Sequence, residues 1–319
     1  MRAPGPPESL ELTELPDPQP RDGWIHIDVK AFGLNRAELM TRQGHSGDAV
    51  PLPRVLGIEC VGSVRDPGGT DLEPGQTVAA AVGGMGRRFD GGYATQVLLP
   101  RSNVFPLKTD LDWPTLGALP ESYLTAWGAL VDSCGLLLGE TVLIRGGSSS
   151  VGLAAAAIAN QRGATSIATT RSEAKRVALV AAGADHVVID RGSIAEDVRE
   201  LAPHGVDRVV ELVGTEESIA DSLQTLRPRG VLCLVGFLGG EWEYGLPWPP
   251  PTVRITFYTT EVTTAEAATP VLQEIVDGIP QCSYRANIHE VFDFEEVPRA
   301  HALMESNGAA GKLVVTTPG

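Results

Sequence analysis

The stretch TVLIRGGSSSVGLAAAAIANQRG, residues 141–163, decides how the chain is interpreted. A short β-favouring run, TVLIR, leads into two glycines and three serines, and an alanine-rich segment typical of a helix follows until Gly163. The first amides of a helix have no partner within it and lie at the positive end of its dipole, so this junction favours a bound phosphate. The residues expected to contact that phosphate are Gly147, Ser148, Ser149, Ser150 and Val151. A tight turn that serves only packing is the alternative interpretation.

The segments around this stretch alternate between strand and helix. From about residue 118, helical segments at 152–162, 173–182 and 216–226 alternate with the strand-like runs TVLIRG, TSIATT, HVVID, DRVVELVG and GVLCLVGF. Because these strands are apolar on both faces, the pattern predicts a parallel sheet covered by helices. Up to about residue 115, short β-rich runs separated by Pro and Gly turns predict an irregular, mainly β domain. The last part adds a strand RITFYT, a helix at 266–277 and a final strand KLVVTT.

Length and composition limit the class of protein. The 319 residues, 43% of them hydrophobic, exceed what one core usually organises, so two domains are expected. No apolar run is long enough for a membrane span, and the N-terminus lacks a signal-peptide pattern, which predicts a cytoplasmic protein without a membrane partner. A formal charge of −15 disfavours binding to nucleic acid. The four cysteines have no CxxC spacing and are expected to be buried apolar side chains in a reducing compartment.

The end of the second strand indicates which dinucleotide the loop would hold. A site for NAD usually has an Asp or Glu there, about 20 residues beyond the loop, bound to the adenosine ribose. This chain instead has Thr170, Arg171 and Ser172, followed by Lys175 and Arg176, and Ser172 is expected to cap the next helix. Basic side chains at a strand end suit the additional phosphate of NADPH, which is therefore the predicted cofactor. An ordinary solvated, basic helix start is the alternative.

Several motifs together carry a family resemblance, which runs from about residue 10 to residue 315. The chain resembles the zinc-independent quinone oxidoreductase branch of the medium-chain dehydrogenase/reductase superfamily in FGLNRAELMTRQG, VLGIECVGSV, GGYATQVLLP, ALPESYLTAWGAL, GGSSSVG and MESNGAAGKLVV. The resemblance implies an α/β fold in which a GroES-like, mainly β catalytic domain (1–117 and 255–319) accompanies a Rossmann domain with a doubly wound parallel sheet (118–254). It also implies NADPH in the cleft and usually a homodimer.

The same resemblance implies further site residues. Asn35 lies near the nicotinamide and the substrate in such a protein, and Met40 and Trp242 belong to regions that form the substrate pocket. The additional cofactor contacts that it implies are Thr125, Val213, Gly214, Gly236, Phe237, Asn307 and Lys312. Three of these residues have a plainer interpretation as turn formers, namely Asn35, Gly214 and Gly236. Glu59 and Glu211 are expected to be structural ion-pair partners rather than catalytic acids.

The zinc ligands of zinc-dependent relatives are absent from the corresponding motifs. In place of the Cys, His and Cys that they provide, this sequence has Asn35, Ile58 and Glu121 in the three regions. The six histidines show no paired ligand spacing and are expected to be surface or capping residues. We therefore expect no metal in this protein.

These features predict an NADPH-dependent reductase of quinones or other α,β-unsaturated carbonyls, whose conjugated oxygen accepts charge without a metal. An enoyl thioester reductase is an alternative on the same scaffold, and a catalytically idle NADPH-binding or structural protein is an alternative of another class. Asp190 is a departure from the family, because some relatives have a Tyr near the 2′-phosphate at that position. Its carboxylate must either turn away or be neutralised by Arg171 and Arg191. The sequence does not identify the physiological acceptor.

Overall fold

The computed structural model describes residues 1–239 and 247–318, and the chain divides into two compact units. Unit 1 comprises Met1–Leu124, Thr260–Pro280 and Ile288–Gly319. Unit 2 comprises Thr125–Thr259 and Gln281–Asn287. The sequence predicted domain limits at 117/118 and 254/255, whereas the units divide at 124/125 and 259/260, with residues 281–287 in unit 2.

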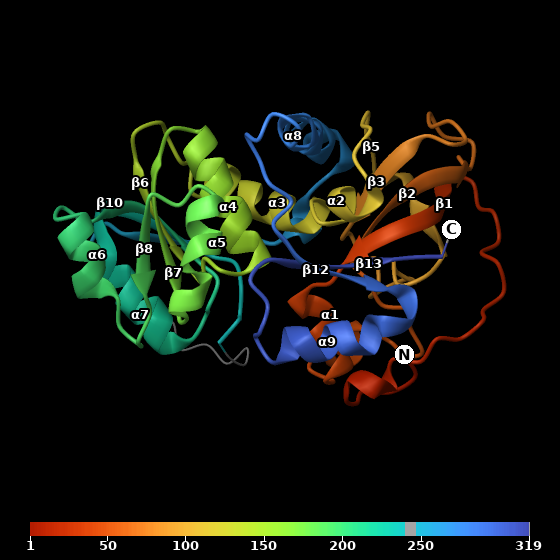
Figure 1. The fold of residues 1–319 in the computed structure, drawn as a ribbon, viewed down its shortest axis with the longest axis horizontal. Coiled ribbons are helices and arrows are strands. Elements are labelled where there is room, and N and C mark those ends of the chain that lie inside the picture. The colour runs from red at the N-terminus through yellow and green to blue at the C-terminus, as the bar shows by residue number, and fades with distance from the viewer. Residues whose placement is uncertain (240–246, 319) are drawn as a thin grey trace. The chain divides into compact units, whose positions relative to one another are not determined.

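Unit 1 is built around a seven-stranded sheet in its described residues. The strand order is β12-β13-β1-β2-β3-β5, and β4 pairs with β1 beside this path. The last strand, β13, pairs antiparallel with β1, so that Ala31 lies opposite Thr316 and both ends of the chain build one sheet (Figure 1). The strands are β1 (Trp24–Gly33), β2 (Glu59–Asp66), β3 (Thr77–Ala81), β4 (Gln96–Pro100), β5 (Val104–Pro106), β12 (Ile288–Asp293) and β13 (Lys312–Thr316).

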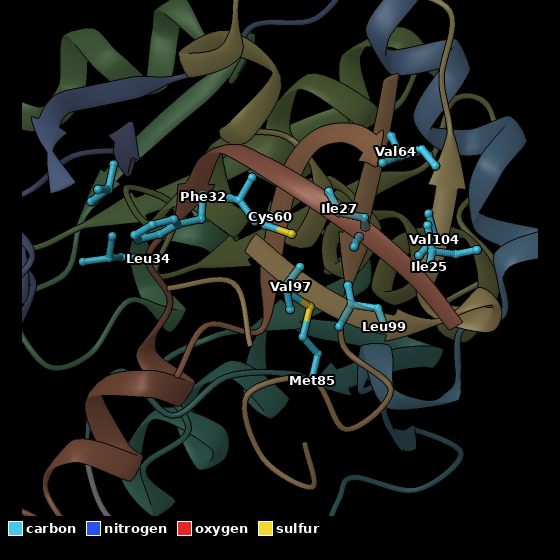
Figure 2. Packing of buried hydrophobic residues seen from close by; sticks show 14 of the residues in the cluster. Ile25, Ile27, Phe32, Leu34, Cys60, Val64, Met85, Val97, Leu99 and Val104 are labelled. Atoms are coloured by element: carbon cyan, nitrogen blue, oxygen red, sulfur yellow. The ribbon is translucent and has the colours of Figure 1, made fainter. Parts of the chain in front are cut away.

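The core of unit 1 comes from the buried faces of these strands. Alternating residues of β1, including Ile25, Ile27 and Val29, are buried because successive side chains of a strand point to opposite faces. Figure 2 shows the packing of this cluster, to which Met85 and Val97 of β4 also belong. Burial of this apolar surface supplies the main favourable free energy of folding for the unit.

The helices of unit 1 are short, apart from α8. They are α1 (Arg36–Arg42), α2 (Trp113–Gly117), α8 (Ala265–Gly278) and α9 (Val297–Glu305), while the residues of α3 (Pro120–Trp127) divide between the two units. The sequence predicted α8 and β13 correctly but missed β12 and α9. The reason lies in β12, which is an edge strand whose residues are mostly exposed or half-buried, so that it lacks a clear apolar run.

Unit 2 contains the predicted parallel sheet. Its described residues form six strands in the order β11-β10-β9-β6-β7-β8, all pairs of which are parallel. This order is that of the doubly wound dinucleotide-binding fold, in which β6 is the first strand. The strands are β6 (Thr141–Arg145), β7 (Thr165–Thr170), β8 (His186–Ile189), β9 (Val206–Glu211), β10 (Leu226–Leu234) and β11 (Arg254–Phe257).

The helices of unit 2 connect these strands as crossovers. They are α4 (Ser150–Gln161), α5 (Arg176–Ala181), α6 (Ala195–Leu201) and α7 (Glu216–Thr225), with a π-helical segment at Gly128–Ser133. In Figure 1, α4 and α5 lie side by side, as do α6 and α7. The α/β class and the strand-helix alternation are confirmed, although α6 was not predicted.

The structure corrects two expectations on burial. Cys60, Cys134 and Cys233 are buried as expected, but Cys282 is exposed. Two histidines expected at the surface are buried instead, His26 beside Gln96 and His301 beside Tyr93, because each finds a hydrogen-bond partner inside unit 1.

Among the described residues, no helix is both long and apolar enough to cross a membrane.

Candidate functional site

The glycine-serine loop lies at the end of β6, where the sequence placed it. Ser149 is the residue before α4, and its hydroxyl accepts a hydrogen bond from the Gly152 amide at 3.1 Å. A Cβ atom on Gly152 would lie 2.5 Å from the carbonyl oxygen of Gly147, so only glycine lets the loop and the helix approach so closely. Within the described residues, the amides of Ser150 and Val151 have no hydrogen-bond partner in the protein. The loop therefore presents donors at the positive end of a twelve-residue helix.

The end of β7 lies against this loop. The Thr170 hydroxyl is 3.3 Å from the Ser148 hydroxyl and also accepts a hydrogen bond from the Ser172 amide at 3.3 Å. Arg171 is exposed and Lys175 is half-buried. Burial and the charge of the neighbouring Arg171 guanidinium lower the pKa of Lys175. A bound anion would relieve their mutual repulsion.

The helix that follows β7 begins later than the sequence suggested. Ser172 is the N-cap residue, as predicted, but of a 3-10 turn, Glu173–Lys175, and its side chain makes no capping hydrogen bond. The α-helix α5 begins only at Arg176, which pairs with Glu173 and donates to the Val187 carbonyl. The guanidinium of Arg176 is thus engaged by its own helix start and by β8.

Asp190 turns away from the basic strand end. One carboxylate oxygen accepts a hydrogen bond from Arg145 Nε at 3.0 Å, and the other accepts one from the Gly192 amide at 2.9 Å. Of the two alternatives that the sequence left open, the Asp190 carboxylate therefore turns away, and it is not neutralised by Arg171 and Arg191. Its side chain points back toward the end of β6. The partner is Arg145, which the sequence analysis had not singled out.

The loops after β9 and β10 bring four predicted cofactor residues together. A Cβ on Gly214 would lie 3.0 Å from Phe237 Cδ1, and the Gly239 amide donates to the Val213 carbonyl at 2.9 Å, so the two loops touch. The carboxylate of Glu211, at the end of β9, accepts hydrogen bonds from the amides of Val213 and Gly214 at 2.9 and 3.1 Å.

Glu211 shapes these loops without an ion-pair partner among the described residues. Burial raises its pKa, while a hydrogen bond from the Ser222 hydroxyl and the Arg145 guanidinium oppose the rise. The expectation of an ion pair is thus replaced by a set of hydrogen bonds. Elsewhere in unit 2, Thr125 lies on α3 and is buried.

In unit 1, Asn35 is part of a buried polar cluster. Its side-chain oxygen accepts a hydrogen bond from Lys312 Nζ at 2.6 Å, and its Nδ2 donates to Glu59 at 2.9 Å and to Glu38 at 3.4 Å. Lys312 and Glu59 form an ion pair at 2.5 Å with side chains 1% and 0% exposed, so the expectation that Glu59 is a structural ion-pair partner is confirmed. A Cβ on Gly33 would lie 2.5 Å from the Glu59 carboxylate, so glycine is required there.

Glu38 completes this cluster. Its carboxylate accepts hydrogen bonds from the Asn35 amide at 3.0 Å and the Ile58 amide at 2.9 Å, which fixes the first turn of α1. Burial raises its pKa to about 7 and the Glu59 charge adds to the rise, although backbone hydrogen bonds from Ile58 and from Glu38 itself and the Lys312 charge favour the ionised form.

The cluster determines what the Asn35 side chain can offer a ligand. Both hydrogens of its amide are directed to the carboxylates of Glu38 and Glu59, and Lys312 uses one lone pair of the oxygen. The remaining lone pair can only accept a hydrogen bond. Sequence reasoning missed Glu38, although the spacing N-x-x-E before an apolar run is a capping signal that would have found it.

The remaining predicted residues lie in different parts of unit 1 or outside the described chain. Met40 lies half-buried on α1. Asn307 is exposed, has a φ of 57°, and its side-chain oxygen accepts a hydrogen bond from Arg36. Lys312 is the first residue of β13 and points its ammonium group at Asn35 and Glu59. Trp242 lies outside the described residues.

The described chain contains no group of three or more His, Cys, Asp or Glu side chains arranged to hold a metal ion. At the three positions where zinc-dependent relatives supply ligands, Asn35 and the Ile58 amide are engaged by Glu38, and the Glu121 amide donates to Glu59 at 2.9 Å.

The sequence matches two family models in consecutive parts of the chain. Residues 21–109 match the alcohol dehydrogenase GroES-like domain, and residues 182–315 match the zinc-binding dehydrogenase family. The chain belongs to the medium-chain dehydrogenase/reductase superfamily. Its similarity to quinone oxidoreductases supports the quinone oxidoreductase branch of that superfamily.

Relatives of this superfamily match almost the entire chain. The quinone oxidoreductase of Lama guanicoe is 28% identical over 317 residues, which cover 98% of this chain and 94% of that protein. Among solved structures, an NAD-dependent alcohol dehydrogenase has a TM-score of 0.87 at 28% identity and covers 100% of this chain and 98% of that chain. A mycobacterial protein complexed with NADPH has a TM-score of 0.87 at 27% identity, with 99% and 98% of the two chains covered.

Other relatives are much longer proteins. The squalestatin tetraketide synthase of Cochliobolus lunatus is 27% identical over 334 residues, which are 100% of this chain but only 13% of that synthase. The similarity therefore concerns one segment of that synthase.

Proposed function

We propose that the protein is a zinc-free, NADPH-dependent reductase that transfers hydride to quinones or other α,β-unsaturated carbonyls. The observation that carries the cofactor part is the combined geometry of the β6–α4 loop and the β7 end. Free amide donors at Ser150 and Val151 suit the pyrophosphate, and Arg171 with Lys175 suits a 2′-phosphate where a carboxylate would suit NAD.

The residues present fit such a dinucleotide. Glycine at position 152 lets the loop pack closely against the first turn of α4, and the Ser148 and Thr170 hydroxyls lie at the same end of the sheet. When bound, the nicotinamide supplies the hydride. In unit 1, the Asn35 oxygen accepts a hydrogen bond from Lys312, which leaves one of its lone pairs for another donor. Because Asn35 has no hydrogen left to donate, polarisation of a substrate carbonyl must come from another donor.

Cofactor choice is tested with two substitutions, Arg171→Ala and Lys175→Ala. Each removes a charge-assisted contact worth roughly 1.5 to 3 kcal/mol before screening, so we expect a higher KM for NADPH and little change for NADH. The matched control is Arg176→Ala, because Arg176 is already paired with Glu173 and should leave both cofactors unaffected. Equal weakening of both cofactors by Arg171→Ala would contradict the assignment of the 2′-phosphate to this site.

Metal independence is tested separately. Since Asn35, Ile58 and Glu121 stand where relatives have zinc ligands, we expect the purified protein to keep its activity after dialysis against a chelator. Stoichiometric zinc that leaves together with the activity would refute this part of the proposal.

The acceptor class is distinguished by a panel of quinones, enones and acyl thioesters, with NADPH oxidation as the readout. An enoyl thioester reductase is the second candidate, and the similarity of the whole chain to a segment of polyketide synthases favours it. The acidic chain, with a charge of −15, disfavours docking to an acidic carrier protein and so favours free small molecules. No NADPH oxidation with any acceptor would instead favour a protein that binds the cofactor without catalysis.

We also propose a homodimer. The strand β11 lies at the edge of the sheet of unit 2, and within the described residues its outer side has no partner strand. Phe257 on this strand is 55% exposed, and an exposed edge of this kind favours pairing with a second chain. Light scattering should give a mass of about 67 kDa, twice the 33.7 kDa of the chain, whereas 33.7 kDa alone would refute the dimer.

A further inference from the structure

Arg145 is a buried cation directly before the dinucleotide loop. It is the last residue of β6, and its side chain is only 2% exposed. Its Nε donates to Asp190 at 3.0 Å, and its Nη1 donates to Asp221 at 2.7 Å and to the Ser218 carbonyl at 2.9 Å. Its Nη2 donates to the Gly192 carbonyl at 3.2 Å. The guanidinium thus joins the ends of β6 and β8 to the helix α7.

Asp190 lies beside the basic end of β7. The register pairs Thr170 with Ile189, and the Asp190 amide donates to the Thr170 carbonyl at 2.8 Å. Arg171 directly follows β7 and Asp190 directly follows β8, and these strands are adjacent and parallel. The two residues therefore lie at the same, carboxyl end of the sheet. From this backbone position, a carboxylate that pointed outward would reach the region that we assign to the 2′-phosphate.

The carboxylate of Asp190 does not point outward. Both of its oxygens are used, one by Arg145 and the other by the Gly192 amide, and the side chain is 11% exposed. The nearby acid Asp221 has its own set of donors, which are the Ser193 hydroxyl and the Ile194 amide in addition to Arg145. Loss of Arg145 would therefore leave Asp190 with a single hydrogen bond, whereas Asp221 would keep several.

We propose that Arg145 is a positioning residue for cofactor choice, which holds the Asp190 carboxylate against the end of β6 and so keeps negative charge away from the 2′-phosphate. This inference rests on the proposed preference for NADPH. Arg145 does not touch the cofactor in this proposal and acts only through Asp190. A released carboxylate would repel a phosphate dianion and could instead accept hydrogen bonds from the ribose hydroxyls of NADH.

A purely structural role for Arg145 makes a different prediction. If Arg145 only stabilised the packing of α7 against the sheet, its loss would weaken the binding of both cofactors to a similar degree. The reason is that the carboxyl ends of β6 and β8 would become less ordered for either cofactor. If it acts through Asp190, its loss changes the ratio of the two affinities, and removal of the Asp190 charge restores that ratio.

The test is a double-mutant cycle with Arg145→Gln and Asp190→Asn. Calorimetry with 2′,5′-ADP and 5′-AMP, and kinetics with NADPH and NADH, give the preference for the 2′-phosphate in each variant. We expect Arg145→Gln to lower this preference by about tenfold or more, since one charge within several ångströms of a dianion has an effect of that order. Asp190→Asn alone should leave the preference unchanged, and the double variant should return it to within about threefold of the parent.

Several outcomes would overturn the inference. An unchanged preference in Arg145→Gln does so, as does a loss that Asp190→Asn fails to restore. If Arg145→Gln does not fold, as judged by circular dichroism, Arg145→Lys replaces it, because the three donors of an ammonium group cannot reproduce the bonds of the guanidinium to Asp190, Asp221 and the Ser218 and Gly192 carbonyls. A parent protein without any preference for NADPH would instead refute the proposed cofactor, and this result is separable because it is measured on the unaltered chain.

Discussion

Replacement of Lys312 by Met should destabilise unit 1 strongly. The Lys312 ammonium lies 2.5 Å from Glu59 and 2.6 Å from the Asn35 oxygen, and both charged side chains are essentially unexposed. Met fills a similar volume, so the main effect is that the Glu59 carboxylate loses its counter-ion in a buried place, with Glu38 close by. Removing one partner of a buried ion pair lowers the free energy of unfolding by about 3–5 kcal/mol.

The matched control is an exposed pair of the same geometry in the same unit. Arg65 lies 2.6 Å from Asp28, but the two side chains are 46% and 29% exposed. Arg65→Met should therefore cost less than about 1 kcal/mol. A second control is the double variant Lys312→Met with Glu59→Gln, which removes both charges. Its loss of unfolding free energy should be about 2 kcal/mol smaller than the sum of the losses in the two single variants.

Hydrogen–deuterium exchange of peptides from β1 and β13 measures this effect in unit 1 alone, since global unfolding of a two-unit protein mixes the two. The protection of these strands should fall in Lys312→Met and stay unchanged in Arg65→Met. The reasoning would be refuted if Lys312→Met and Arg65→Met lowered the protection equally. It would also be refuted if the effects of Lys312→Met and Glu59→Gln were strictly additive, because burial would then not explain the contribution of the Lys312–Glu59 pair to stability.

Three further predictions concern pH and packing. The pKa of Glu38 rises from 4.5 to about 7 on folding, so its contribution to stability is present below pH 4.5 and is lost as the pH rises to about 7; Glu38→Gln should flatten this part of the pH dependence in urea unfolding. Burial and Arg42 lower the pKa of His301 from 6.5 to about 3, so its contribution is present above pH 6.5 and is lost as the pH falls toward 3; an unchanged acid slope in His301→Gln would contradict this. Gly152→Ala should raise the KM for NADPH and lower the melting temperature, because the new Cβ meets the Gly147 carbonyl; unchanged values for both would refute the close approach.

The features of unit 2 that the sequence predicted are local ones. The run from Thr141 through the loop to the alanine-rich helix contains its own strand, turn and helix signals, and the basic end of β7 follows within a short distance. Arg145 could not be interpreted in this way, because its partners Asp190 and Asp221 come from later strands and helices and meet it only in the folded sheet.

The buried polar cluster around Asn35 in unit 1 was even less predictable from the sequence. Asn35, Glu59 and Lys312 are far apart in the sequence, and nothing near any of them indicates the other two. Resemblance to a family supplied Asn35 and Lys312 as site residues, but their mutual contact and the direction of the Asn35 amide required the pairing of β13 with β1. The acceptor-only character of Asn35 is likewise a property of the assembled cluster.

The pairing of β1 with β13 has a consequence for synthesis on the ribosome. Unit 2 is almost continuous in the sequence and is complete once Asn287 has been made, so it can fold while the chain is still growing. The sheet of unit 1 has to wait for Lys312–Thr316, while β1 and β2 have long been exposed. We therefore expect β1 of the nascent chain to lack its β13 partner until residues 312–316 have been made, which makes this unit the part most dependent on chaperones.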